Sequence, residues 1–203
     1  MKLIHSPMSP YVRKIHVMLH ELGKTDAVEL HEVQTTAFQS DDALVATNPL
    51  GKIPALQRDD GITLYDSRVI STFLNETYQG GLYPQGGRKW ETLVLEATGD
   101  GIMDSTVSMS YEMRLRPENE QSPKWIEAQW EKASRAIGVI NSRWMSHLHG
   151  PLDMAQISVA CALSYANFRH GARQWQTGNT ALAEWHGKFE SRPSMQATKP
   201  PEV

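Results

Sequence analysis

The first 78 residues alternate short apolar runs with helical patterns. Residues 3–4 and 28–33 are predicted strands, and residues 10–22 carry apolar positions three and four apart, which predicts a helix between them. Ser9 stands at the N-cap of that helix, Pro10 at its first position and Gly23 just past its end, where each residue type is favoured. The polar stretch 34–48 is predicted to be loop with one short helix.

Residues 55–58 and 62–65 are two further strand-like runs, and the Asp59-Asp60-Gly61 turn between them predicts a hairpin. A helix over residues 67–78 follows. The predicted order is therefore β-α-β-α-β-β-α, an α/β domain with a mixed sheet, and a glycine-rich linker at residues 79–87 ends it.

Beyond the linker the pattern is helical throughout. Helices are predicted at about residues 90–113, 124–148, 153–168 and 180–190. Residues 153–168 are apolar nearly all round, which is typical of a helix buried at the centre of a domain. We therefore predict two domains, an α/β domain at residues 1–78 and an all-α domain at residues 84–203.

The composition of the 203 residues, with 40% hydrophobic and 21% charged residues, is that of a globular protein. The net charge of -3 gives no bulk attraction for nucleic acid or an anionic membrane, so neither partner is expected. The N-terminus lacks the apolar segment of a signal peptide, no apolar run is long enough to span a bilayer, and Cys161 is the only cysteine. These features predict a reducing, cytoplasmic location.

Ser9 is the first candidate for chemistry, because it follows a strand and begins a helix. Free backbone N–H groups and the helix dipole favour an anion at such a place. A thiol ionises more readily there, and the Ser9 hydroxyl can donate a hydrogen bond to the thiolate. The alternative interpretation is that Ser9 is only an N-cap.

The second candidate is the segment 48–56, Asn-Pro-Leu-Gly-Lys-Ile-Pro-Ala-Leu. A cis bond between Ile53 and Pro54 would expose the backbone N–H and C=O of Ile53, which could then pair with a peptide-like ligand as an added strand. A rigid turn without a ligand is the alternative.

The third candidate is the pair Asp66-Ser67, which opens a helix. Ser67 offers a hydroxyl and a backbone N–H to a carboxylate, and Asp66 offers a negative charge to an ammonium group. Together they match the two ends of an amino acid, although a simple capping pair is the alternative. The three candidates jointly suit a small thiol peptide with a free α-amino acid end.

In this order and spacing, the three pieces resemble the thioredoxin-like domain of the glutathione transferases. The helical half, with Asp153-Met154-Ala155-Gln156-Ile157, resembles the C-terminal domain of that family, so the resemblance covers nearly the whole chain. Residues 100–104, 167–169 and 198–201 are similar to the bacterial YibF-like branch. One departure lies at the start of the buried helix. The family usually has Ser or Thr at the N-cap and Asp three residues later, whereas this chain has Asp153 and Gln156 there. We still expect Asp153 and Gln156 to cap reciprocally.

The resemblance implies a homodimeric enzyme that adds the glutathione thiolate to small electrophiles. Ser9 would stabilise the thiolate, Ile53 and Pro54 would hold the cysteinyl part, and Asp66 with Ser67 would hold the γ-glutamyl end. Lys52 would reach the glycyl carboxylate, although a solvated lysine is the alternative. A glutathione-dependent peroxidase, isomerase or dehalogenase and a non-catalytic glutathione-binding protein remain alternative functions.

The remaining candidates are an apolar pocket, a histidine pair and the single cysteine. A pocket for the electrophile beside Ser9 is expected from four residues, with core packing as the equal alternative: Met8, Met103, Tyr111 and Phe168. His16 and His20 have the spacing of two zinc ligands, but no third ligand completes a motif, so no metal is expected. Cys161 is interpreted as a small core residue. Some relatives have cysteine at the Ser9 position, but Ser9 cannot form a mixed disulfide and Cys161 lies in the other domain, which argues against glutathione-dependent reduction as the main activity.

Overall fold

The computed structural model describes residues 1–201, which fall into two compact units. The first unit comprises Met1–Tyr83 together with residues 193–201, and the second comprises Pro84–Arg192. The sequence analysis places residues 84–203 together in the helical domain, whereas in the structure residues 193–201 group with the first unit.

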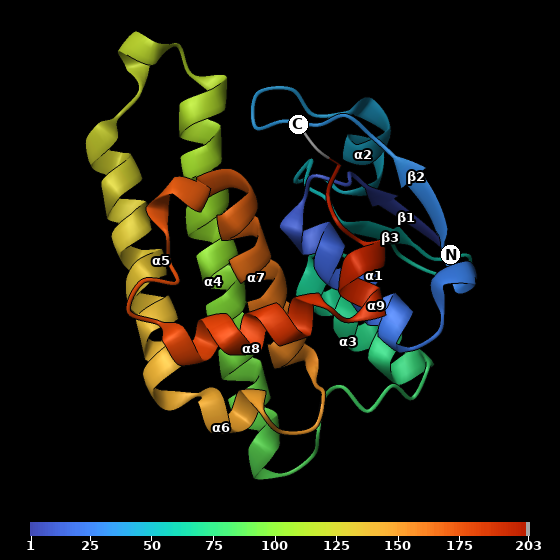
Figure 1. Ribbon diagram of the computed structural model, residues 1–203. Helices are drawn as coiled ribbons and strands as arrows, with labels where there is room; N and C mark the ends of the chain where they lie inside the picture. Colours follow the sequence, from blue (N-terminus) through green and yellow to red (C-terminus); the bar gives the residue numbers. More distant parts are fainter. Residues whose placement is uncertain (202–203) are drawn as a thin grey trace. The chain divides into compact units, whose positions relative to one another are not determined.

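The first unit is built on a mixed three-stranded sheet, as the alternation of strands and helices predicts. The order is β2-β1-β3, in which β1 (Lys2–His5) runs parallel to β2 (Glu29–Glu32) and antiparallel to β3 (Ala55–Gln57). Helices α1 and α3 lie side by side, and α9 lies against α1 (Figure 1). The helices of this unit and its 3-10 turn are α1 (Pro10–Glu21), η1 (Thr25–Ala27), α2 (Asp42–Thr47), α3 (Ser67–Thr77) and α9 (Pro193–Ala197).

The fourth predicted strand, at residues 62–65, is wrong in extent. Only Leu64 pairs with the sheet, exchanging two backbone hydrogen bonds of 2.9 Å with Leu56. Ile62, the other apolar residue at the start of this run, is 76% exposed. The run therefore has no apolar face to bury, and a strand with nothing to pack against does not extend beyond one pair.

The short helix α9, which the sequence analysis does not predict, is held against α1. Arg13 Nη2 donates a 3.1 Å hydrogen bond to the Met195 carbonyl, and the Ser194 hydroxyl donates to the Glu21 carboxylate. The Met195 side chain is fully buried. Helix α9 thus contributes Met195 to the hydrophobic core of the first unit.

The second unit is all helical, and α7 is its buried centre. Its helices and 3-10 turns are α4 (Gly87–Leu115), η2 (Glu118–Glu120), α5 (Pro123–Arg143), α6 (Met145–Leu148), α7 (Met154–His170), η3 (Gly171–Arg173) and α8 (Thr180–Glu190). Helix α4 approaches α7 closely at Gly99, where a Cβ would lie 2.5 Å from Ser158 Oγ. The predicted helix 124–148 is wrong in one respect, because it is interrupted at Trp144 between α5 and α6. Among the described residues, no helix is both long and apolar enough to cross a membrane.

Candidate functional site

The sheet register brings the first two predicted pieces to one end of the sheet. Ala55 lies opposite Ile4 in the antiparallel pairing of β3 with β1. The chain that leaves β1 toward Ser9 and the chain that enters β3 from Ile53 therefore lie at the same sheet end.

The third piece reaches the same end through the single bridge of the predicted hairpin. Leu64 pairs antiparallel with Leu56, so the chain after Leu64 runs back toward the beginning of β3. Asp66 and Ser67 follow within three residues and open α3. The N-termini of α1 and α3, with their partial positive charge, both start from this end of the sheet.

Ser9 caps α1 and keeps a free hydrogen. The Val12 N–H donates to Ser9 Oγ at 3.4 Å, so the hydroxyl oxygen has the predicted capping role. The hydroxyl hydrogen of Ser9 has no acceptor within residues 1–201. The two interpretations of Ser9 are therefore compatible, because the cap uses a lone pair of the oxygen and an anion would accept the hydrogen.

Ile53 is anchored by its side chain and leaves its backbone unpaired. The side chain packs against a buried cluster that includes Ile4, Leu44 and Ala55, and the bond to Pro54 is cis. Neither the N–H nor the C=O of Ile53 has a hydrogen-bond partner in the described part of the chain. This free donor and acceptor are the groups that an extended peptide needs for strand-like pairing.

Asn48 fixes the turn that presents Ile53, a role that the sequence analysis misses. Its side chain is 1% exposed, and Nδ2 donates to the Lys52 carbonyl at 2.7 Å while Oδ1 accepts from the Leu50 N–H at 3.0 Å. The signal in the sequence is the Asn-Pro that opens the segment, since asparagine commonly bonds backbone groups in turns. The Lys52 side chain itself is exposed.

Asp66 is the N-cap of α3 and is bound by Arg68, a second residue that the sequence analysis misses. The Arg68 N–H donates to Asp66 Oδ1 at 3.0 Å, and its guanidinium donates to Oδ2 at 2.9 Å. Burial alone would raise the pKa of the Asp66 carboxyl, but these hydrogen bonds and the charges of Arg68 and Lys14 outweigh it and hold the pKa below its ordinary value. Asp66 is therefore an anion at neutral pH.

Ser67 is 3% exposed, yet its hydroxyl has no partner in residues 1–201. The capping carboxylate of Asp66 accepts from the Arg68 N–H and not from the Ser67 N–H. The Ser67 N–H therefore also has no hydrogen-bond partner within residues 1–201. An unpaired hydroxyl and N–H at a helix N-terminus form a donor pair suited to a carboxylate.

The four residues predicted to line an apolar pocket lie in both units. Met8 is a half-buried residue of the first unit. In the second unit, Met103 is fully buried in α4, and Tyr111 is 42% exposed near the end of that helix. The Phe168 ring of α7 lies edge-on to the Tyr165 ring, with the two ring centroids 6.4 Å apart. Their joint role as a pocket stays a prediction.

The predicted histidine pair is not part of a metal cluster. In residues 1–201, no three His, Cys, Asp or Glu side chains are grouped to hold a metal ion. His16 instead faces His5, with ring centroids 5.2 Å apart, and its Nε2 is buried without a hydrogen-bond partner. Burial above all, then the charges of His5 and His20, lowers the pKa of His16 to about 4.

This pKa predicts an acid-sensitive fold. The unfolded chain takes up a proton at His16 near pH 6.5 and the folded chain only near pH 4, so the stabilisation is complete above pH 6.5 and is lost as the pH falls toward 4. His16→Phe should remove about 2 kcal/mol of the drop in unfolding free energy between pH 7 and pH 4.5, measured by urea unfolding. His149→Gln, which replaces an exposed histidine of the second unit, is the control. An unchanged pH slope in His16→Phe would contradict the prediction.

Comparison with known proteins relates both units to one family. Residues 8–77 match the model of the glutathione S-transferase N-terminal domain, and residues 123–188 match that of the glutathione S-transferase C-terminal domain. Over 207 residues that cover both chains completely, the chain is 30% identical to the uncharacterized GST-like protein YibF of Escherichia coli (strain K12).

Two crystal structures of a glutathione transferase family member from Pseudomonas fluorescens Pf-5 are similar along the whole chain. The structure with bound glutathione is 43% identical and superposes with a TM-score of 0.96 over 99% of both chains. The structure with bound S-(propanoic acid)-glutathione is 41% identical and superposes with a TM-score of 0.91 over 100% of both chains.

Proposed function

The chain belongs to the glutathione S-transferase family, and we propose that it is an enzyme that adds the glutathione thiolate to small electrophilic molecules. One observation carries the proposal. The described protein leaves three sets of polar groups unpaired at one end of the sheet: the Ser9 hydroxyl hydrogen, the Ile53 backbone and the Ser67 hydroxyl with its N–H. Unpaired donors and acceptors gathered at one end of the sheet are available to bind the polar groups of a ligand in place of water.

The proposed ligand is glutathione, which is bound in the similar structure from Pseudomonas fluorescens Pf-5. Its cysteinyl backbone would pair with Ile53 beside Pro54, and its γ-glutamyl carboxylate would accept hydrogen bonds from Ser67. The ionised Asp66 would bind the α-ammonium group, and Lys52 would reach the glycyl carboxylate. In this arrangement Arg68 shares Asp66 with the ligand and keeps it ionised.

The chemical role falls to Ser9 and the start of α1. A cysteine thiol has a pKa of about 8.5, and lowering it by about two units leaves most of the thiol ionised at neutral pH. The helix N-terminus and a hydrogen bond from Ser9 both stabilise the thiolate, and the other contacts hold the tripeptide in place.

We propose α,β-unsaturated carboxylic acids as one class of electrophile. The structure of the relative holds S-(propanoic acid)-glutathione, and thiolate addition to acrylate would give a conjugate of this composition. In that step the sulfur–carbon bond forms at the β-carbon, the carbon–carbon π-electrons move to the α-carbon, and that carbon takes up a proton. No group leaves, so thiolate activation is the main task of the protein.

A panel of electrophiles tests the function and separates the alternatives. The purified protein with glutathione should form sulfur–carbon adducts with an aryl halide or with acrylate, detected by mass spectrometry. Oxidised glutathione formed only with an organic hydroperoxide would instead indicate a peroxidase. Glutathione binding without turnover of any class would indicate a non-catalytic binding protein.

Ser67→Ala tests the binding mode. We expect glutathione affinity to fall about tenfold, because a charge-assisted hydrogen bond is lost. Stability should stay within about 0.5 kcal/mol of the parent, because the hydroxyl has no partner in the described protein. Calorimetric titration measures the affinity, with Thr72→Ala, an exposed substitution on α3, as the control. Equal affinity in Ser67→Ala and the parent would reject the role of Ser67.

Helix α4 has an exposed apolar face that bears on the assembly of the protein. Helix α4 exposes Trp90 and Val94, which are 67% and 54% exposed and lie four residues apart on one face. Large exposed apolar side chains that share one face favour burial in an interface. We propose that a second copy of the chain covers them, giving the homodimer, and that the protein acts in the cytoplasm.

A further inference from the structure

Residues 193–201 lie along helix α1 and run toward its N-terminal end (Figure 1). The Ser194 hydroxyl donates to the carboxylate of Glu21, the last residue of α1. Four residues later, Thr198 lies beside Arg13, the fourth residue of α1, whose Nε donates to Thr198 Oγ1 at 3.5 Å. The segment is therefore antiparallel to α1 and is fixed to it at both ends.

Two further residues carry the segment to the level of Ser9. A residue that precedes proline is extended, so Lys199 and Pro200 add about 7 Å of chain beyond Thr198. Arg13 and Ser9 are one helical turn apart, about 5.4 Å along the axis, and the Arg13 N–H donates to the Ser9 carbonyl at 3.0 Å. Lys199 therefore leaves the segment near the N-terminus of α1, where the thiolate is proposed to lie.

Lys199 is a cation without an anionic partner in the described chain. Its side chain is exposed, and its ammonium group has no hydrogen bond or ion pair within residues 1–201. The first turn of α1 contains no acidic residue that could pair with it. Asp66, the acidic residue of the proposed site, is already bound by Arg68 at 2.9 Å. This end of α1 is therefore suited to a second anionic group beside the thiolate.

The proposed reaction with an unsaturated acid brings such a second anion. When the sulfur attacks the β-carbon of acrylate, the carboxylate carbon lies only three bonds from the sulfur. Two like charges about 4 Å apart repel each other by about 1 kcal/mol even in water. The π-electrons that move toward the α-carbon and its carboxylate add to this negative charge until water supplies the proton. A cation beside the carboxylate stabilises the acid at each of these stages, whereas a neutral acceptor gains nothing from it.

We propose that Lys199 binds the carboxylate of the unsaturated acid and so makes the site selective for acidic over neutral electrophiles. The inference rests on the proposed function, because it concerns the electrophile at the same site. It adds a residue from the segment after α9, which none of the proposed glutathione contacts includes.

Lys199→Gln tests the proposal through the ratio of kcat/KM for acrylate to kcat/KM for the neutral analogue acrylamide. The value for acrylate should fall about fivefold, as expected for loss of an exposed ion pair, and the value for acrylamide should stay the same. Lys199→Arg should restore the ratio. Lys24→Gln is the matched control, because Lys24 is an exposed lysine beyond the opposite end of α1. A structural role of Lys199 alone would change both values together.

Calorimetric titration with S-(propanoic acid)-glutathione and its amide separates this inference from the proposed function, because binding needs no turnover. The parent should bind the acid about fivefold more tightly than the amide, and Lys199→Gln should bind both alike. That pattern without turnover of either acceptor would refute the transferase and keep the role of Lys199. Turnover of both acceptors with the same ratio in Lys199→Gln and the parent would overturn the role of Lys199 and keep the transferase. Equal affinity of the parent for acid and amide, or no binding of the acid, would also overturn it.

Discussion

Ser9→Ala is expected to lower the kcat/KM for glutathione conjugation by about tenfold to a hundredfold and to leave glutathione affinity nearly unchanged. A hydrogen bond to a charged group contributes about 1.5–3 kcal/mol, and the Ser9 hydroxyl hydrogen is free to make one to the thiolate. Without it the pKa of the bound thiol should rise by about one to two units. The ultraviolet absorption of the thiolate, followed against pH in the complex, measures this shift directly.

Loss of the N-cap complicates this substitution, because Ser9 Oγ also accepts from the Val12 N–H. Removing a serine cap costs about 1 kcal/mol of stability whatever its role in catalysis. Ser122→Ala is the matched control, since Ser122 caps α5 in the same way by accepting from the Trp125 N–H at 3.2 Å. Both variants should lose similar stability, and only Ser9→Ala should lose turnover. Equal turnover in Ser9→Ala and the parent would remove Ser9 from the mechanism.

The parts of the fold that the sequence predicts well are those set by local interactions. Helix α1 begins at Pro10 after Ser9, as the capping signals require. The reciprocal cap of Asp153 and Gln156 at α7 is confirmed, because both side chains bond the backbone of the other residue. Such signals act within four residues, so the sequence contains everything needed to recognise them.

The features that the sequence analysis misses depend on partners far along the chain. Residues 62–65 have the composition of a strand, but Ile62 has no apolar surface to pack against. Only Leu64 pairs with the sheet, in place of the predicted four-residue strand. Helix α9 is held by Arg13 and Glu21 of α1, more than 170 residues earlier, and a five-residue segment has no helical periodicity of its own to detect. The break at Trp144 likewise accompanies a long-range bond to α6, in which Trp185 Nε1 donates to the carbonyl of Leu148, the last residue of that helix.

In the candidate site, too, some residues can be recognised from local sequence and others only from the folded chain. Ser9, Ile53 and Ser67 stand out from local sequence, because each lies at a helix start or beside a proline. Asn48 and Arg68 act through hydrogen bonds, Asn48 to the turn before Ile53 and Arg68 to the capping carboxylate of Asp66. These roles can be recognised only from the hydrogen bonds of the folded chain. The unpaired state of the Ser67 hydroxyl is also a property of the folded chain.

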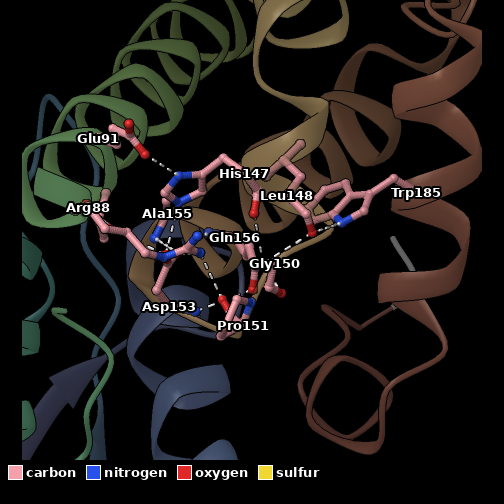
Figure 2. Close-up of polar contacts among 11 residues, drawn as sticks. Arg88, Glu91, His147, Leu148, Gly150, Pro151, Asp153, Ala155, Gln156 and Trp185 are labelled. Atoms are coloured by element: carbon pink, nitrogen blue, oxygen red, sulfur yellow. Dashed lines mark hydrogen bonds and ion pairs between the residues drawn. The ribbon is translucent and has the colours of Figure 1, made fainter.

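The largest loss of stability is expected at the N-terminus of α7, where Asp153 joins several elements. Asp153 is 1% exposed, and its side chain accepts from Arg88 at 2.9 Å and from His147 Nε2 at 2.9 Å (Figure 2). It also accepts from the Thr92 hydroxyl at 3.1 Å. The same carboxylate accepts from the Ala155 N–H at 3.1 Å. Asp153 thus connects α4, α6 and α7 through one buried carboxylate.

Asp153→Ala should lower the free energy of unfolding by about 3–5 kcal/mol, because the buried partners lose their acceptor all at once. At about 2–4 °C per kcal/mol for a chain of this size, the melting temperature should fall by about 10 °C. Asp153→Asn keeps an oxygen for the cap and removes the charge, so its loss should be smaller than that of alanine. Calorimetry and urea unfolding measure both.

Glu91→Gln is the control that distinguishes loss of the buried Asp153 carboxylate from loss of any negative charge near His147. Glu91 Oε2 lies 3.4 Å from His147 Nδ1, but its side chain is 58% exposed, so its loss should cost less than about 1 kcal/mol. If Asp153→Ala were no more destabilising than Glu91→Gln, the connection of three helices through Asp153 would be energetically unimportant. If Asp153→Asn lost as much as alanine, the charge rather than the cap would be the dominant contribution, because the amide retains the capping oxygen.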